Sequence, residues 1–435
     1  MLSLTPRRAA SILLKLVAVS SIAAAAARAN GAFPDEFSIH FPPDAQHRIL
    51  LGANFGLLVS EDDGATWRYS CEPWVVAGSN AALASANVGF YQVTAAGAIL
   101  ANSVNLTRSS DVGCTWPIST GSVGGQIVTD FFPDPNDATF VLAIVTLSSG
   151  TGSYIVASHD GGITFDAPHL YDTPDLLTGI EIALSKRGVV YATSVSTSGA
   201  ATFLASTNSG AAGSWTPTPL EVSRQTQPRI LAIDPADEKT VYLRLLSGPS
   251  DSISVTTNGG QSFTQSPILT INGQFSAFLR AGDGALYAGT RDGKLYVQAA
   301  GTSGFATRDG PHFRCLGQRR GATRIYACAD MIVDGYSLAT SDDNGITFHP
   351  MMSFTQLLGP LTCAPVQTNC EAHWERIQGV LGIGSGADAG QNPGGGSGSG
   401  GGSHCASAGA DLPALLAFAV ILWRRAERRT KVSSR

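Results

Sequence analysis

The sequence is poor in charge. Lys, Arg, Asp and Glu make up 14% of its 435 residues, whereas soluble proteins usually contain about 25%. The formal net charge is −5, and binding to duplex phosphates needs clustered Lys and Arg. The charge balance therefore argues against nucleic acid as a partner. Hydrophobic residues make up 43% of the chain, enough for a core, so the chain is not disordered.

The sequence also lacks the patterns that hold cofactors. It contains no Gly-rich phosphate loop, and its eight His residues include no His-x-x-x-His pair. Its cysteines include no Cys-x-x-Cys pair, the spacing that is typical of zinc sites. We therefore expect neither a metal nor a nucleotide cofactor.

The N-terminal end is typical of a secretory signal. A basic start with Arg7 and Arg8 precedes an apolar stretch over residues 16–27, and residues 27–29 read Ala-Arg-Ala. This small-x-small pattern predicts cleavage after Ala29. The alternative is a buried or membrane helix, but the apolar run is short for a membrane span.

The C-terminal end has three parts. A Gly/Ser-rich linker, residues 381–404, is followed by Cys405, an apolar run over residues 412–423 and an arginine cluster at residues 424–429. The apolar run is shorter than the about 20 residues that span a bilayer, and the basic cluster favours a cytoplasmic end. The order of these parts resembles the C-terminal sorting tail of myxobacterial surface proteins. The resemblance implies processing near Cys405 and display at the cell surface, with a plain single-span membrane anchor as the alternative.

The basic residues of the two ends partly cancel the negative charge of the middle of the chain. Without them the chain keeps 18 basic and 30 acidic residues, a net charge near −12. The middle of the chain is therefore clearly acidic. The sequence predicts four parts: a signal peptide at residues 1–29, a folded body at 30–380, a linker at 381–404 and a sorting or anchor segment at 405–435.

An eight-residue motif recurs through the body, and we call each copy a box. Its pattern is Ser/Thr-x-Asp/Asn-x-Gly-x-Thr/Ser-Trp/Phe, and copies begin at residues 60, 109, 158, 206, 256 and 341, the copy at 206 with an insertion. The first five starts are 48–50 residues apart, and the last gap of 85 is nearly two periods. A degenerate copy fills that gap, because residues 286–297 keep the strand pair that precedes each box while the box itself, at residues 298–305, has decayed. The body therefore contains seven repeats.

The box resembles the Asp box of the BNR repeat family, which occurs in sialidases, some β-glucanases, sortilin-type receptors and photosystem assembly factors. Its glycine takes a positive φ, its carboxylate accepts N–H bonds from a tight turn, and its aromatic residue covers the edge of a blade. We therefore expect structural roles, not catalytic ones, for the box residues Asp62, Gly64, Trp67, Asp111, Gly113, Trp116, Asp160, Gly162, Phe165, Asn208, Trp215, Asn258, Phe263, Asp343, Gly345 and Phe348.

The segments around each box read as four strands. In the fifth repeat, strands are expected at residues 230–235, 240–245 and 252–257, with Phe263 starting the fourth. Four strands per repeat form one propeller blade, and seven blades lie within the known range. The predicted fold is an all-β, seven-bladed β-propeller, with short apolar helices at the N- and C-terminal ends. Which strand closes the ring stays open.

The body has an even number of cysteines, which in an exported protein indicates disulfides. Six cysteines allow 15 pairings, and we expect pairing between sequence neighbours. The expected pairs are Cys71–Cys114, Cys315–Cys328 and Cys363–Cys370.

An enzyme is one of two competing interpretations. Sialidases of the family are similar in using an arginine triad, a Tyr nucleophile assisted by Glu, and an acid Asp. Their Phe-Arg-Ile-Pro motif is missing, and the nearest string is His47-Arg48-Ile49-Leu50. Arginines that could converge are Arg229, Arg244, Arg280 and Arg324. Possible acids, for which surface or turn roles are favoured, are Asp130, Asp172, Asp175, Glu181 and Asp334.

The other interpretation is a binding module. Loops of several blades meet at the top face of a propeller and form a natural site for a glycan, a peptide or a surface protein. Residues 148–153 and 194–201 are rich in Ser, Thr and Gly, which suits polar contacts. The sequence thus favours a secreted, surface-anchored, non-catalytic binding or scaffold protein that meets the membrane through its C-terminal segment. A sialidase-like or β-glucanase-like glycoside hydrolase is the alternative, with no catalytic residue assigned.

Overall fold

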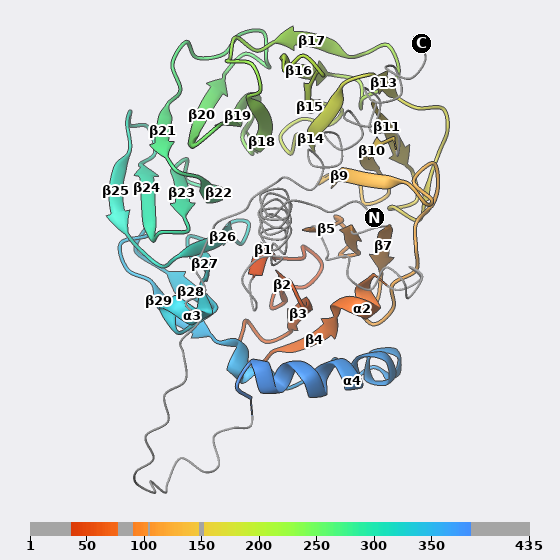
Figure 1. Cartoon of the computed structure of the whole chain (residues 1–435), viewed down its shortest axis with the longest axis vertical. Coiled ribbons are helices and arrows are strands. Elements are labelled where there is room, and N and C mark those ends of the chain that lie inside the picture. The colour runs from red at the N-terminus through yellow and green to blue at the C-terminus, as the bar shows by residue number, and fades with distance from the viewer. Residues whose placement is uncertain (1–35, 77–89, 103–104, 148–151, 384–435) are drawn as a thin grey trace, which may run out of the picture. The chain divides into compact units, whose positions relative to one another are not determined.

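The computed structural model describes residues 36–76, 90–102, 105–147 and 152–383. Within them, seven small β-sheets are arranged in a ring and form the predicted all-β, seven-bladed propeller (Figure 1). The expected signal peptide and sorting tail, with their apolar helices and Cys405, lie outside the described residues. Among the described helices, none is long and apolar enough to cross a membrane.

The first three blades are built from consecutive segments of the chain. Blade 1 contains β1 (Glu36–His40), β2 (Ile49–Ala53), β3 (Gly56–Ser60) and β4 (Arg68–Cys71). Blade 2 contains β5 (Phe90–Val93), β6 (Ile99–Asn102) and β7 (Leu106–Ser109). Blade 3 contains β9 (Ile127–Pro133), β10 (Val141–Thr146), β11 (Ser153–Ser158) and β13 (Tyr171–Thr173). The short strands β8 (Thr120–Gly121) and β12 (Thr164–Phe165) pair in parallel and link blades 2 and 3.

The last four blades are four-stranded antiparallel meanders. Blade 4 contains β14 (Leu176–Ile182), β15 (Val190–Val195), β16 (Ala201–Ser206) and β17 (Thr216–Pro219). Blade 5 contains β18 (Gln227–Asp234), β19 (Asp237–Ser247), β20 (Ser250–Thr256) and β21 (Leu269–Asn272). Blade 6 contains β22 (Phe275–Arg280), β23 (Leu286–Thr290), β24 (Lys294–Gln298) and β25 (Ala306–Asp309). Blade 7 contains β26 (Phe313–Gln318), β27 (Ile325–Ala329), β28 (Leu338–Ser341) and β29 (His349–Met352).

The core lies between the blades. The second and third strands are covered by neighbouring blades on both sides, and every residue of β2, β3, β10 and β11 is buried. These strands therefore read as continuous apolar runs instead of alternating ones. The first strands line the centre of the ring, where each contacts the first strands of the adjacent blades, as β14 does with β9 and β18.

The fourth strand of blade 5 differs from the prediction. It begins at Leu269, not at Phe263. The chain after Phe263 still follows β20, because Thr264 and Ile268 donate N–H bonds to Val255 and Ile253. The spacing between these bonds is too irregular for a strand until residue 269. The expected strands at 230–235, 240–245 and 252–257 overlap β18, β19 and β20.

The ring closes without exchange of strands between its ends. Blade 1 contains only N-terminal strands, and blade 7 only C-terminal ones. After β29 and the 3-10 helix η2 (Phe354–Gln356), the chain runs beside β4, where Leu358 N–H donates to Trp67 O and Leu361 N–H donates to Tyr69 O. Helix α4 (Ala364–Val380) then packs outside blade 1 (Figure 1).

Two of the three disulfides lie where the ring closes, and the third lies within blade 7. Cys315–Cys328 joins β26 to β27, as predicted. The other two predicted pairs are wrong, because the structure pairs Cys71 with Cys370 and Cys114 with Cys363. Pairing by proximity in the sequence failed because closure of the ring brings the C-terminal segment against blades 1 and 2. Each of these two disulfides therefore joins the end of the body to its beginning.

Candidate functional site

The box of blade 1 is a self-contained hydrogen-bonded turn. Ser60 Oγ accepts the Gly64 N–H at 2.8 Å and donates to Asp62 Oδ1 at 2.8 Å. Asp62 also accepts the N–H and the hydroxyl of Thr66, at 2.8 and 2.7 Å. Trp67 Nε1 donates to Gly64 O at 2.9 Å. Gly64 has a φ of +89°, which favours glycine. The acidic group is thus engaged in the turn.

The same bonds recur around the ring. Asp111, Asp160 and Asp343 each accept both the N–H and the hydroxyl of the Thr four residues later. These bonds favour the ionised carboxylate, and the Thr347 hydroxyl is the largest cause that lowers the pKa of Asp343. In the box of blade 5, Asn258 replaces Asp and binds Ser262 through its Oδ1 and Nδ2 atoms. These residues therefore lie in hydrogen-bonded turns that follow the third strands of their blades.

Five of the six box glycines also lie close to the preceding blade, whereas Gly210 in blade 4 lies against Trp215 of its own box. A Cβ atom added at Gly260 would lie 2.2 Å from Cε1 of Phe203 in blade 4. One added at Gly64 would lie 2.2 Å from Cε of Met351 in blade 7. The boxes thus help to hold the blades together.

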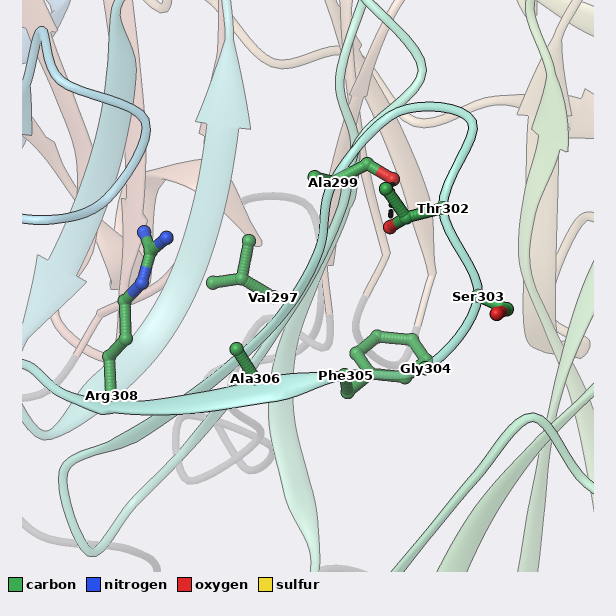
Figure 2. A pocket seen from close by; sticks show the side chains of 8 residues that line it. All are labelled: Val297, Ala299, Thr302, Ser303, Gly304, Phe305, Ala306 and Arg308. Atoms are coloured by element: carbon green, nitrogen blue, oxygen red, sulfur yellow. Dashed lines mark hydrogen bonds between the residues drawn. The ribbon is translucent and has the colours of Figure 1, made fainter.

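Blade 6 has no box, and a shallow hollow lies at the decayed copy. The loop between β24 and β25 leaves a space of about 380 Å³ lined by Val297, Phe305, Arg308 and the polar residues Thr302 and Ser303 (Figure 2). Thr302 Oγ1 donates to Ala299 O, within the same loop. The Thr302 hydroxyl is bound within its own loop, and the hollow is open to solvent. The hollow therefore offers few groups that would select a ligand.

The arginines considered for a sialidase triad do not converge. Three of them bind carboxylates in different parts of the ring, and the fourth, Arg229, lies on β18 near Asp130. The pairs are Arg244–Asp251 within blade 5 at 2.6 Å, Arg280–Asp234 between blades 6 and 5 at 2.6 Å, and Arg324–Asp342 within blade 7 at 2.8 Å.

Three of the five possible acids lie outside the inner strands. Asp172 is exposed and binds His169 Nδ1 at 2.6 Å. Asp334 ends helix α3 (Met331–Asp334) and binds His312 Nδ1 at 2.8 Å. Asp175 lies in the turn before β14, where its N–H donates to Thr173 Oγ1. Only Asp130 and Glu181 lie together.

Asp130 and Glu181 lie on the adjacent inner strands β9 and β14, and both are partly buried. Asp130 accepts the N–H groups of Phe131 and Ile180, each at 2.9 Å. Burial raises the pKa of Asp130 to about 6, against the opposing effect of these bonds and of Arg229. Burial also raises the pKa of Glu181 to about 8, and the charge of Asp130 adds to the effect. The pair therefore holds a proton near neutral pH and combines a donor with an acceptor.

The sequence did not single out this pair. It named both residues among five acids, but only the ring shows that they share its centre. A position in the first strand of a repeat was the available signal. Across the part of the chain that the structure describes, no group of three or more His, Cys, Asp or Glu residues could hold a metal ion.

Comparison with known proteins bears on the fold. No family model and no curated protein matches the sequence. Similar solved structures include the Dos1 propeller (9% identity, 68% of this chain, 90% of that chain, TM-score 0.47). A second is the extracellular domain of BT4673 from B. thetaiotaomicron (13% identity, 72% of this chain, 39% of that chain, TM-score 0.47). A third is PorZ, a surface component of the type-IX secretion system of Porphyromonas gingivalis (12% identity, 74% of this chain, 39% of that chain, TM-score 0.50).

Identities this low show the fold alone. The chain spans 39% of the length of both BT4673 and PorZ. It is a seven-bladed β-propeller with three disulfides, similar in structure to bacterial extracellular propeller domains. Disulfides of this kind are typical of proteins outside the reducing cytosol.

Proposed function

We propose that the chain is a secreted, cell-surface-anchored propeller of the BNR/Asp-box type that acts as a non-catalytic binding or scaffold protein. The observation that carries this proposal is the use of the charged residues. The carboxylates of Asp62, Asp111, Asp160 and Asp343 are bound within turns, and three candidate arginines are paired with carboxylates. These groups stabilise turns and blades, and the Arg280–Asp234 pair joins two blades.

The proposed location rests on the two ends of the sequence. The predicted signal peptide and sorting tail agree with three disulfides in the body. PorZ, a fold neighbour, is a bacterial surface component. Fractionation of cells tests this part of the proposal: the full chain is expected at the cell surface, and a chain that ends at residue 404 is expected in the medium. Retention of the full chain in the cytosol with reduced thiols would overturn it.

We place the partner on the face opposite the boxes. Antiparallel strands put the boxes at one end of each blade and the turns between second and third strands at the other. That second face carries α3, whose Ile332 and Val333 side chains are 67% and 59% exposed, and the turn after β15, where Ser196 Oγ caps the backbone. A glycan, a peptide or a surface protein would meet apolar and hydroxyl groups there.

Binding to a glycan array and to cell-envelope fractions tests this face. A double substitution, Ile332→Ser with Val333→Ser, is expected to weaken capture at least tenfold. The matched control is Ile346→Ser, which removes a side chain of similar exposure, 62%, from the box of blade 7 on the other face. Equal losses in both variants would rule out the proposed face.

A glycoside hydrolase is the second candidate, and the Asp130–Glu181 pair is what favours it. A neutral Glu181 would serve as the acid and an ionised Asp130 as the base or nucleophile. Purified protein is incubated with a panel of polysaccharides and sialosides, alongside the Glu181→Gln, Asp130→Asn and Asp172→Asn variants. Hydrolysis that survives only in Asp172→Asn would establish this candidate, and the absence of turnover in the unsubstituted protein would reject it.

A further inference from the structure

The C-terminal part of the body forms a clasp, which we define as residues 357–380. The clasp is joined covalently to the first two blades, because Cys370 of α4 bonds to Cys71 at the end of β4 and Cys363 bonds to Cys114 in the box of blade 2. The bonded cysteines are 299 and 249 residues apart in sequence. Nearly the whole ring therefore lies between the two ends of the first disulfide.

The clasp is also packed against blade 1. Val366, Cys370 and Ile377 of α4 are buried in the same apolar cluster as Tyr69. The Trp374 ring lies 5.4 Å from that of Tyr69, centroid to centroid. This packing covers the first disulfide, since both Cys71 and Cys370 have no exposed surface.

The position of the clasp fixes where tension would enter the fold. Helix α4 ends at Val380, whose side chain is 65% exposed, and the predicted linker begins at residue 381. A pull on the linker reaches Cys370 before it reaches any strand. At Cys370 the load can cross to Cys71, and the chain between them is bypassed.

We infer that the clasp carries tension across the point where the ring closes and protects blades 2 to 7 from tension applied through the C-terminal tether. Without the disulfides, the same tension would peel α4 from blade 1 and then unravel blade 7 from β29. With them, the load passes from α4 into β4 of blade 1 through covalent bonds. The biological sense of this inference rests on the proposed surface anchoring, whereas the mechanical property belongs to the ring itself.

Single-molecule pulling on the full exported chain tests the inference. Handles are attached at the two ends, and Cys405→Ser is present in every sample so that the six body cysteines remain. Under oxidising conditions, the 299 residues between Cys71 and Cys370 are expected not to extend. Adding a reductant should then lengthen the unfolded chain by roughly 1,000 Å, at about 3.5 Å per residue.

Paired variants sharpen the result. Removing the first disulfide, with Cys71→Ser and Cys370→Ser, leaves Cys114–Cys363 as the bypass and should release 50 more residues, the difference between 299 and 249. That gain is roughly 170 Å of chain. The matched control, Cys315→Ser with Cys328→Ser, removes a disulfide inside the bypassed segment and should leave the oxidised extension unchanged.

The outcomes separate cleanly. Full extension of the oxidised chain, or no lengthening on reduction, would overturn the inference, and reductant on the unsubstituted protein decides the matter even if a Cys variant fails to fold. Failure of the surface-anchoring proposal would appear in cell fractionation and would leave these lengths unaffected.

Discussion

The junction between blades 4 and 5 and the junction between blades 7 and 1 use similar contacts but different chain connections. At the first, Gly260 packs under Phe203, Thr178 Oγ1 donates to Pro228 O at 2.7 Å, and the chain continues directly from β17 to β18. At the second, Gly64 packs against Met351, but no short connection joins the two blades. The clasp and its disulfides stand in place of that connection.

The difference shows what a ring needs beyond good contacts. Bringing distant parts of a chain together costs loop entropy that grows slowly with length, and a short connection between adjacent blades avoids most of this cost. Disulfides offset it at the closing junction by restricting the unfolded chain. Stability should therefore depend more on covalent bonds at the closing junction and more on packing contacts, such as those of the box glycines, at the other junctions.

Removing one of the two disulfides at the closing junction should have the largest effect. Replacing both Cys71 and Cys370 by Ser is expected to lower the free energy of unfolding by about 2–5 kcal/mol. Denaturant titration of the folded protein measures the change. The control pair, Cys315→Ser with Cys328→Ser, opens a loop with a separation of only 13 residues and should cost less. A larger loss in the control would mean that the closing junction does not depend on its disulfides.

Crowding a box glycine should weaken an ordinary junction. Gly260→Ala places a Cβ at 2.2 Å from the Phe203 ring, at a φ of +87°, and is expected to cost about 1–3 kcal/mol. Gly301→Ala in the decayed box of blade 6 is the matched control, since its φ is +70° but no atom lies within 4 Å. Thermal melts of the two variants should separate crowding from backbone strain, and equal shifts would argue that the contact with Phe203 is unimportant.

Removing a box carboxylate should have a smaller effect. Asp160→Ala deletes the acceptor for Ile163 N–H, Thr164 N–H and the Thr164 hydroxyl, and a loss of about 1–2 kcal/mol is expected. Ser303→Ala, in the loop that has lost its box, should stay within about 0.5 kcal/mol of the parent. Urea midpoints test the pair, and a neutral Asp160→Ala would show that the box turn forms without its carboxylate.

The smallest expected effect is a pH dependence at the centre of the ring. A folded pKa of about 8 for Glu181 means that the folded state binds more protons than the unfolded state between the usual pKa of a glutamate and pH 8, so stability falls as the pH rises towards 8. Glu181→Gln removes this loss. Glu181 is only partly buried, so solvent screening keeps the effect well below that of the full shift, and the melting temperature of the variant should rise relative to the parent between pH 5 and pH 8. A constant difference across this range would place the ionisation elsewhere.

The repeat made the blades predictable. Each box follows the third strand of a blade, so counting boxes counted blades, and the strand pair at residues 286–297 revealed the degenerate copy. Such local patterns need only nearby residues. The start of β21 was missed because Thr264 and Ile268 keep some pairing with β20 without forming a strand, a detail that no apolar pattern carries.

Contacts between residues far apart in the sequence could not be predicted from it. Cys71 meets Cys370 only because blade 7 returns to blade 1, and the period of a repeat gives no information about the segment that closes it. The same holds for Asp130 and Glu181, which are 51 positions apart and become neighbours because β9 and β14 both line the centre. Their chemistry depends on burial, which sequence spacing does not reveal.

The Cys71–Cys370 bond turns most of the body into a covalent macrocycle. A protease that cuts one exposed turn between these cysteines would open the circle without releasing a fragment, because both new ends remain attached through the disulfide. Cuts between Cys114 and Cys363 would leave the pieces attached twice. A protein displayed among extracellular proteases would thus survive single nicks with its blades still in place, and only a second cut or a reducing agent would let a piece leave.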